Sequence, residues 1–173
     1  KMIFRYPDYY EKFSCIAGAC EDTCCAGWEI DIDDKSYEYY KTVGGAFGVM
    51  LRQNIKEYEN DEEDAYESHG FILKEGRRCP FLNENQLCVI YQELGEQALC
   101  DVCTDTPRDF LEYGGARELA LSASCPEAGR LIYRNKEKMK VVEKEISEPF
   151  PWKETEDEQV LADEILFARN QAI

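Results

Sequence analysis

The sequence predicts an α+β fold: a small, irregular, cysteine-rich metal-binding domain with short hairpins and several helices, as a fragment of a longer protein. Nine cysteines occur in 173 residues, most of them near glycine or proline. Short runs with alternating apolar residues predict strands, and longer runs with apolar residues at helical spacing predict helices. Hydrophobic residues make up 44% of the chain, enough to bury a core. Residues 169–173 lie inside a helical pattern without a Gly or Pro stop, so we expect the natural protein to continue.

The first part of the chain is expected to contain one strand and two helices. Apolar residues alternate over 28–32, which predicts a short half-buried strand. Helices are expected over 34–43 and 46–58, because Gly44-Gly45 separates two runs with helical spacing. The segment 57–67 carries seven acidic residues and no basic one, which predicts a solvated loop or helix end.

The remaining elements are expected to be short and separated by turn residues. In order, they are a strand at 71–73, a turn-linked knuckle or hairpin at 79–88, a short helix at 89–99 interrupted near Gly95, a hairpin of 109–113 and 117–122, a helix at 127–133, a strand or helix at 139–146, a linker at 149–152 and a helix at 157–172. Gly114-Gly115 suits the tight turn of the hairpin, and Pro126 suits the first position of a helix. We therefore expect a cysteine-rich metal- or iron–sulfur-binding domain at 1–146, and a linker and the start of a helical C-terminal region at 147–173.

The charge of the chain narrows the possible partners. There are 36 acidic and 20 basic residues, for a formal net charge of -16. This balance argues against nucleic-acid binding, which needs clustered Lys and Arg, but it permits a basic partner such as a lysine-bearing substrate. The sequence has no run of about 18 apolar residues that predicts a membrane span, and residues 1–7 do not resemble a signal peptide. We therefore expect a cytoplasmic protein without a membrane partner.

The spacing of the cysteines predicts a thiolate site instead of a set of disulfides. The pattern is Cys15-x4-Cys20-x3-Cys24-Cys25, Cys79-x8-Cys88, Cys100-x2-Cys103 and Cys125. An odd total cannot be fully paired, and the adjacent Cys24 and Cys25 could be joined only by a strained bond. The reducing cytosol disfavours disulfides, whereas thiolates at short spacing can converge on one metal. Cys15 and Cys125 have about even odds of being buried small hydrophobes instead of ligands, because free cysteine is often buried.

Spacing alone does not separate zinc from an iron–sulfur cluster, because four thiolates can hold either. Only Cys100-x2-Cys103 has the form of a zinc knuckle, and His69, far from every cysteine in sequence, is expected to be a surface or loop residue. The spacing CxxxCxxC of radical S-adenosylmethionine enzymes is absent. The cationic side chains nearest to the cysteines are Arg77, Arg78 and Arg108, which are candidates to compensate thiolate charge.

Other motifs give weaker evidence for a function. The glycines from Gly44 to Gly48 do not follow a clear strand and are interpreted as a helix break instead of a dinucleotide fingerprint. A single histidine does not support a Ser-His-Asp triad. The tyrosine-rich segments could form an aromatic wall over a cation, but their spacing favours core packing. They contain Tyr9, Tyr10, Tyr37, Tyr39 and Tyr40.

The cysteine motifs together resemble the flagellin lysine-N-methylase family. The matching segments are Phe13–Asp33 with its four cysteines, Arg78-Cys79-Pro80-Phe81-Leu82, Leu87-Cys88-Val89-Ile90-Tyr91, Leu99-Cys100-Asp101-Val102-Cys103 with Pro107-Arg108, and Glu118–Ala128. The resemblance covers about residues 7–135. A looser similarity, CC…CPFL…C-x-IY, extends to small bacterial domains described as zinc- or iron-chelating.

The resemblance implies an enzyme that methylates lysine side chains of flagellin with S-adenosylmethionine as donor. It also implies an iron–sulfur cluster, of the 4Fe-4S type, with zinc as the alternative occupant. The ligands would come from a pool of seven cysteines: Cys20, Cys24, Cys25, Cys79, Cys88, Cys100 and Cys103. The catalytic residues and those that bind the methyl donor stay unassigned. The alternative function is a non-catalytic zinc- or iron-chelating structural or redox module.

Overall fold

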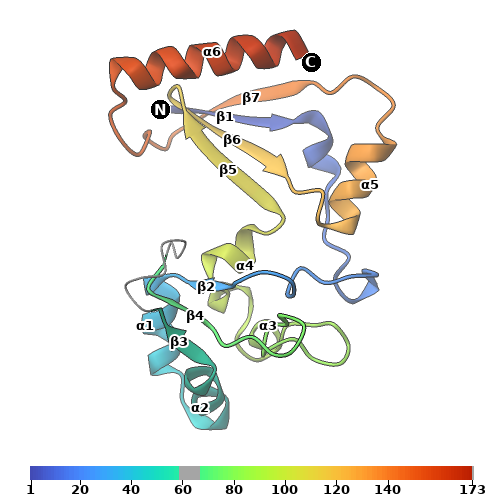
Figure 1. Ribbon diagram of the computed structural model, residues 1–173, viewed down its shortest axis with the longest axis vertical. Coiled ribbons are helices and arrows are strands. Elements are labelled where there is room, and N and C mark those ends of the chain that lie inside the picture. The colour runs from blue at the N-terminus through green and yellow to red at the C-terminus, as the bar shows by residue number, and fades with distance from the viewer. Residues whose placement is uncertain (59–66, 173) are drawn as a thin grey trace. The chain divides into compact units, whose positions relative to one another are not determined.

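The computed structural model describes residues 1–58 and 67–172, which form two compact units (Figure 1). Lys1–Cys15 and Pro107–Ile173 make up the first, which we call the sheet unit. Ile16–Thr106 make up the second, the cysteine unit. Across the described residues there are six α-helices and seven strands in two sheets, which confirms the predicted α+β class.

A four-stranded sheet organises the sheet unit. Its strands are β1 (Met2–Pro7), β5 (Arg108–Tyr113), β6 (Ala116–Leu121) and β7 (Val141–Ile146), in the order β5-β6-β1-β7. The N-terminal strand β1 runs parallel to β6 and antiparallel to β7. Because β1 lies between strands from the end of the chain, the two ends of the sequence share one sheet. A short 3-10 helix, η1 (Asp8–Lys12), follows β1.

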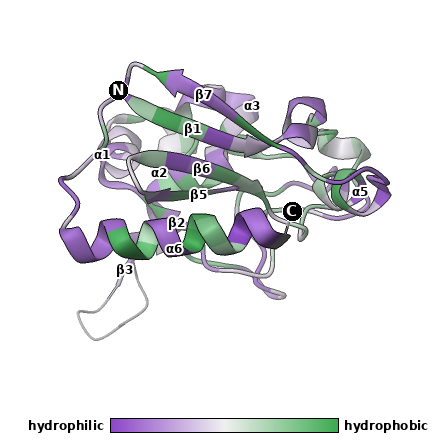
Figure 2. Cartoon of the chain, turned by 90° about the horizontal axis from the view of Figure 1, so that it is seen from above, coloured by the Kyte–Doolittle hydropathy of each residue, from purple (hydrophilic) through white to green (hydrophobic). Residues whose placement is uncertain are grey.

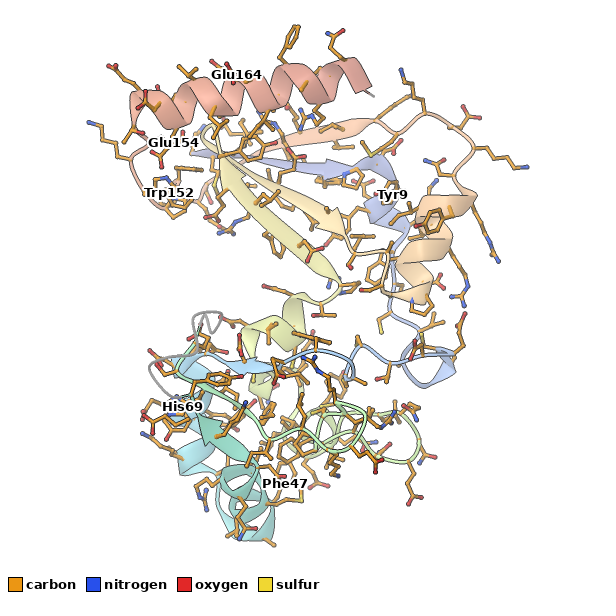
Figure 3. All side chains as sticks on the ribbon, in the orientation of Figure 1. Tyr9, Phe47, His69, Trp152, Glu154 and Glu164 are labelled. Atoms are coloured by element: carbon orange, nitrogen blue, oxygen red, sulfur yellow. The ribbon has the colours of Figure 1, made fainter. Side chains whose placement is uncertain are left out.

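Two helices complete the sheet unit: α5 (Pro126–Arg134), which begins at Pro126, and α6 (Glu156–Ala172). The α6 helix contacts strand β5, and its Arg169 forms an ion pair with Glu118 of β6 at 2.6 Å. The carboxylate of Glu154, before α6, accepts hydrogen bonds from the N–H groups of Gly114 and Gly115 (2.6 and 3.1 Å; Figure 3). Hydrophobic and hydrophilic residues both occur along α6 (Figure 2).

The cysteine unit combines a small sheet with four helices. The strands are β2 (Asp31–Ile32), β3 (Ile55–Glu57) and β4 (His69–Phe71), paired in the order β2-β4-β3. The helices are α1 (Asp34–Thr42), α2 (Gly45–Gln53), α3 (Val89–Leu94) and α4 (Asp101–Asp105), with two 3-10 turns, η2 (Ala17–Ala19) and η3 (Glu96–Ala98). Helix α1 begins at Asp33, whose side chain accepts a hydrogen bond from the N–H of Ser36 at 2.8 Å.

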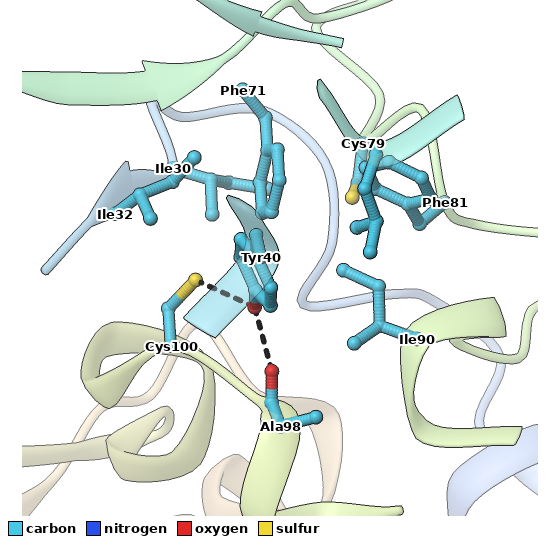
Figure 4. Close-up of a cluster of buried hydrophobic side chains, with 10 residues drawn as sticks. Ile30, Ile32, Tyr40, Phe71, Cys79, Phe81, Ile90, Ala98 and Cys100 are labelled. Atoms are coloured by element: carbon cyan, nitrogen blue, oxygen red, sulfur yellow. Dashed lines mark hydrogen bonds between the residues drawn. The ribbon is translucent and has the colours of Figure 1, made fainter. Parts of the chain in front are cut away.

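One hydrophobic core fills the cysteine unit (Figure 4). Its fully buried members include Ile30, Ile32, Tyr40, Leu51, Phe71, Phe81 and Ile90, together with Cys79 and Cys100. The rings of Phe71 and Phe81 meet edge to face, with their centroids 5.2 Å apart. The core therefore takes residues from almost every element of the unit, and two of the predicted ligand cysteines belong to it.

Several elements follow the sequence prediction. Helices α1, α5 and α6 lie where they were expected, the 108–121 hairpin turns at Gly114-Gly115, and α3 ends at Gly95, whose φ is +87°. The segment 139–146, for which the sequence allowed a strand or a helix, contains strand β7, which pairs with β1.

Other predictions are wrong or incomplete. The helix expected over 46–58 ends at Gln53, and the residues after it form β3, which pairs with β4. The strand expected over 28–32 is reduced to its last two residues, and β4 lies at 69–71 instead of 71–73. Most of the acidic 57–67 segment lies outside the described residues.

The two compact units are not continuous along the chain. The chain passes from β7 to α6 within the sheet unit, and the boundaries between units fall near residues 15 and 107. Strand pairing of β1 with β6 and β7 brings the N-terminal segment into the sheet unit. In the described segments, no helix is both long enough and apolar enough to cross a membrane.

Candidate metal centre

The structure separates the nine cysteines into two groups. Seven of them lie in the cysteine unit, namely Cys20, Cys24, Cys25, Cys79, Cys88, Cys100 and Cys103. The remaining two, Cys15 and Cys125, belong to the sheet unit. All nine lie in the described residues, and none of the nine forms a disulfide there. The group of seven is the same pool that the family resemblance implied.

Backbone hydrogen bonds join the Cys24-Cys25 loop to Cys79. The N–H of Cys79 donates to the carbonyl of Cys25 at 2.8 Å. Within the loop, the N–H of Cys25 donates to Oγ1 of Thr23 at 3.1 Å, and Nε1 of Trp28 donates to the carbonyl of Cys24 at 2.9 Å. Cysteines that are more than 50 positions apart in sequence are therefore held beside each other by the main chain.

Cys79 and Cys88 lie at the two ends of a short turn, as the sequence predicted. Leu82 and Cys88 form an isolated antiparallel bridge, and the N–H of Val89 donates to the carbonyl of Phe81 at 2.8 Å. The side chain of Asn83 accepts from two N–H groups inside the turn. A single asparagine thus closes the loop through side-chain hydrogen bonds, which is a common use of this residue.

Cys100 and Cys103 lie at the start of α4, with Cys100 as its N-cap residue. The N–H of Cys103 donates to the carbonyl of Cys100 at 3.0 Å, which closes the first turn. Two residues of α1 hold this turn from outside. Asp33 accepts from the N–H of Asp101 at 2.9 Å, and the hydroxyl of Tyr40 lies 3.3 Å from Sγ of Cys100.

Thiol–thiol hydrogen bonds shift the pKa values within two of the pairs. The S–H of Cys25 donates to Cys24, which lowers the pKa of Cys24 to about 6 and raises that of Cys25 above its ordinary value. In the same way Cys103 donates to Cys100, which lowers the pKa of Cys100 and raises that of Cys103. Each pair therefore combines one sulfur that favours the thiolate with one that keeps its proton.

Burial governs the third pair. It raises the pKa of Cys79 to about 11, against a hydrogen bond from the N–H of Phe81. Burial also raises the pKa of Cys88, although N–H groups at the start of α3 act in the opposite direction. The three pairs also influence one another. Negative charge on Cys79 and Cys88 raises the pKa of Cys25, after the larger effects of Cys24 and burial.

The donor chemistry of this region fits a thiolate-held metal. Five thiols belong to one core or pack against it, and backbone N–H groups point at four of the sulfurs, as is common around zinc–thiolate and iron–sulfur sites. Over residues 1–58 and 67–172, however, no three His, Cys, Asp or Glu side chains are placed closely enough to hold one ion. In two of the pairs, Cys24–Cys25 and Cys100–Cys103, a thiol–thiol hydrogen bond shares a proton, and a bound metal would have to replace that proton.

Lys74, a cation that the sequence analysis did not propose, acts on the thiol of Cys79. Lys74 donates to the carbonyl of Pro80 at 2.9 Å, and its charge counteracts the rise in the pKa of Cys79. Its signal in the sequence was weak, because it lies five residues from Cys79. The bridge between Lys74 and Arg78 folds the chain back and brings the lysine to that cysteine.

The three arginines proposed from sequence have other partners. Arg77 forms an ion pair with Glu29 at 3.1 Å, and Arg78 donates to Oε1 of Gln86 at 3.1 Å. Arg108 belongs to the sheet unit, where its guanidinium lies over the rings of Tyr10 and Phe13.

His69 lies in strand β4 and is partly buried, so the expectation of a surface or loop histidine is wrong. Its ring stacks on Tyr37 with centroids 3.6 Å apart, and its Nδ1 is buried without a hydrogen-bond partner among the described residues (labelled in Figure 3). Of the other α1 tyrosines, Tyr40 packs in the core as expected, whereas Tyr39 is exposed.

Comparison with known proteins identifies the family. The chain is 29% identical over 151 residues to lysine-N-methylases of Salmonella typhimurium and Salmonella choleraesuis, and covers 35% of their length. It is 30% identical over 142 residues to the flagellar biosynthetic protein FliU of Salmonella muenchen. This match includes 80% of the chain and 81% of FliU. No family model and no solved structure matches the chain. The chain therefore belongs to the family of FliU and the lysine-N-methylases, the same flagellin lysine-N-methylase family that its cysteine motifs resemble.

Proposed function

We propose that the chain is the thiolate-bearing part of a protein-lysine N-methyltransferase that modifies flagellin with S-adenosylmethionine as methyl donor. The observation that carries this proposal is the similarity to the lysine-N-methylases, which extends over 81% of the chain. The name of FliU, a flagellar biosynthetic protein, supports flagellin as the substrate. The chain spans about a third of the lysine-N-methylases, so the activity is proposed for the protein that contains this region.

The proposed reaction transfers one methyl group. The bond between the sulfonium sulfur and the methyl carbon breaks, a bond from the lysine nitrogen to that carbon forms, and S-adenosylhomocysteine leaves. The amine must be neutral to attack, so its proton passes to a base or to solvent beforehand. The net charge of -16 would favour the approach of a lysine-bearing protein surface, because opposite charges increase encounter rates.

We further propose that the seven cysteines of the cysteine unit are the ligand pool of an iron–sulfur cluster, of the 4Fe-4S type, with zinc as the alternative. The five thiols in or against one core and the N–H groups directed at sulfurs in this unit support this assignment. A cluster bound there would join loops that are distant in sequence and would supply a redox-active group. A reducing compartment such as the cytoplasm would keep the nine cysteines reduced.

One observation favours a purely structural role for the metal. Cys79 and Cys100 are themselves buried core residues, and Cys25, Cys88 and Cys103 pack against that core. A metal at such a position stabilises the fold whether or not any chemistry occurs nearby. The second candidate function is therefore a non-catalytic metal-binding module.

A methyl-transfer assay separates the two functions. The full-length protein that contains this chain is purified without oxygen, reconstituted with iron and sulfide, and incubated with flagellin and methyl-labelled S-adenosylmethionine. A Salmonella lysine-N-methylase serves as the positive control, and flagellin with chemically blocked lysines as the negative control. Label on unblocked flagellin alone is the expected result.

Iron and sulfide analysis of the same sample makes the negative result informative. If the positive control is active and the full-length protein contains its cluster but transfers no methyl group, the methyltransferase function is wrong. If only zinc is found and its removal unfolds the chain, the structural module is the correct function.

A further inference from the structure

The hydroxyl of Tyr40 lies between a carbonyl and a thiol in the core of the cysteine unit (Figure 4). It is 2.6 Å from the carbonyl oxygen of Ala98 and 3.3 Å from Sγ of Cys100. The exposed fractions of Tyr40 and Cys100 are 0% and 1%, so water does not compete for these contacts. Cys100 thus has a neutral hydrogen-bonding group fixed beside its sulfur.

The number of protons determines which way these contacts run. A phenol has one proton to donate, whereas a carbonyl oxygen can only accept. When the Tyr40 hydroxyl donates to the carbonyl of Ala98, its oxygen can accept a hydrogen bond from the S–H of Cys100. When Cys100 loses its proton to bind a metal, the sulfur becomes an acceptor, and the phenol can donate to it instead. The same side chain therefore satisfies both states of the thiol.

Helix α1 fixes the phenol in this position. At the start of the helix, Asp33 accepts from the N–H of Asp101, the residue after Cys100. Near its end, Tyr40 packs against Phe71 with ring centroids 6.2 Å apart. The turn that carries Cys100 is therefore held at two points of one rigid element, and the hydroxyl is oriented before any metal arrives.

We propose that Tyr40 is a positioning residue of the thiolate site, whose phenol donates a hydrogen bond to the sulfur of Cys100 when that sulfur is a metal ligand. This inference rests on the proposed metal site. A donor on a ligand sulfur stabilises the thiolate, strengthens metal retention and raises the reduction potential of an iron–sulfur cluster. Tyr40 would have these three effects without touching the metal.

The test compares Tyr40→Phe with Tyr39→Phe in the anaerobically reconstituted chain. Tyr39 is on the same helix, but its ring is 41% exposed. The Tyr40→Phe variant keeps the ring and loses only the hydroxyl. We expect it to release its metal to a chelator about 10- to 100-fold more readily than the wild type. We also expect a more negative cluster reduction potential, whereas Tyr39→Phe behaves like the wild type.

A second variant covers the case in which Tyr40→Phe does not fold, which circular dichroism would reveal. Placing 3-fluorotyrosine at position 40 makes the phenol a stronger donor without removing it, so the reduction potential should rise and metal release should slow. If a folded Tyr40→Phe or fluorotyrosine variant shows unchanged metal release and an unchanged cluster reduction potential, the role of Tyr40 is wrong, whereas the proposed metal site is not affected. If the wild-type chain binds neither iron–sulfide nor zinc, the metal site itself is wrong and this role with it.

Discussion

The carboxylate of Asp33 accepts a hydrogen bond from the backbone N–H of Asp101 at 2.9 Å, across 68 positions of the chain. Its other oxygen accepts from the N–H of Ser36 at 2.8 Å, so one side chain caps both α1 and α4. Because α4 carries Cys100 and Cys103, this carboxylate couples the first helix of the cysteine unit to one of its thiol pairs.

Replacing Asp33 with Ala should therefore destabilise the cysteine unit. An N-cap of this kind contributes about 1 kcal/mol, and loss of the bond to Asp101 should add to that cost. Urea unfolding would be followed by the fluorescence of Trp28, in a Trp152→Phe background that leaves this tryptophan as the probe of the unit. Asp34→Ala, a change at the exposed neighbour, is the control, and equal midpoints for the two variants would contradict the prediction.

The effect of Asp33 should depend on pH. Burial acts to raise the pKa of this carboxyl, but hydrogen bonds from Asp101 and Ser36 outweigh it, so the pKa lies below the ordinary 3.8. A carboxyl with a lowered folded pKa contributes stability above its unfolded pKa and loses it as the pH falls through the folded value. The gap between wild type and Asp33→Ala should be constant from pH 7 to about 5 and shrink below about pH 4. A gap that grows on acidification would disprove this assignment.

The division of cysteines between the units predicts which substitutions affect bound metal. Replacing Cys79 or Cys100 with Ala should reduce the iron or zinc content per chain, because each belongs to the thiol cluster of the cysteine unit. A Cys15→Ala/Cys125→Ala double variant should retain the wild-type content, because both residues lie in the sheet unit. The metal is quantified by elemental analysis after anaerobic purification. Loss of metal from the double variant would place the site elsewhere.

Cys24 should react with iodoacetamide at unusually low pH in the metal-free, reduced chain. Cys24 is an exposed residue, and the hydrogen bond from Cys25 lowers its pKa to about 6. Because the thiolate is the nucleophile, alkylation at this position should be half-maximal near pH 6 and nearly maximal at pH 7. Mass spectrometry of tryptic peptides measures the rate.

A Cys25→Ala variant provides the comparison, because it removes the donor and leaves Cys24 in place. Its pH profile should move upward toward the ordinary thiol value of 9.0. Identical profiles in the two proteins would show that the thiol–thiol hydrogen bond does not control this reactivity.

The packing around α2 requires glycine at position 48, whereas position 44, before the helix, has room for a side chain. A Cβ at Gly48 would lie 1.9 Å from the carbonyl oxygen of Val43, which also accepts from Arg52 at 2.8 Å. Gly48→Ala should therefore cost about 1–3 kcal/mol, as expected for forced overpacking. Gly44→Ala meets no atom within 4 Å and should change stability by less than about 0.5 kcal/mol. The Trp28 unfolding assay applies again, and equal costs would contradict the packing at α2.

Several local features of this protein could be predicted from its amino-acid sequence. Gly114-Gly115 specified the turn of its hairpin, Pro126 the start of α5 and Gly95 the end of α3, because each relies on backbone conformations that its own residue type favours. The cysteine spacing predicted a thiolate site, and the motifs identified the family, whose resemblance implied the pool of seven thiols. These signals act within a few residues, where chain connectivity alone fixes the geometry.

The pairing of segments that are distant in sequence became known only from the tertiary structure. The pairing of β1 with β6 and β7 joins the ends of the chain, which no local pattern reveals, and the end of the helix predicted over 46–58 became β3 because β4 offered it hydrogen bonds. Tyr40 reached Cys100, 60 positions away, by the same long-range folding, whereas Lys74 was brought to Cys79 by its bridge to Arg78. The cysteines could therefore be identified from their spacing in the sequence. The groups that act on their sulfurs could not, because such groups act through proximity in space, and no sequence spacing marks them.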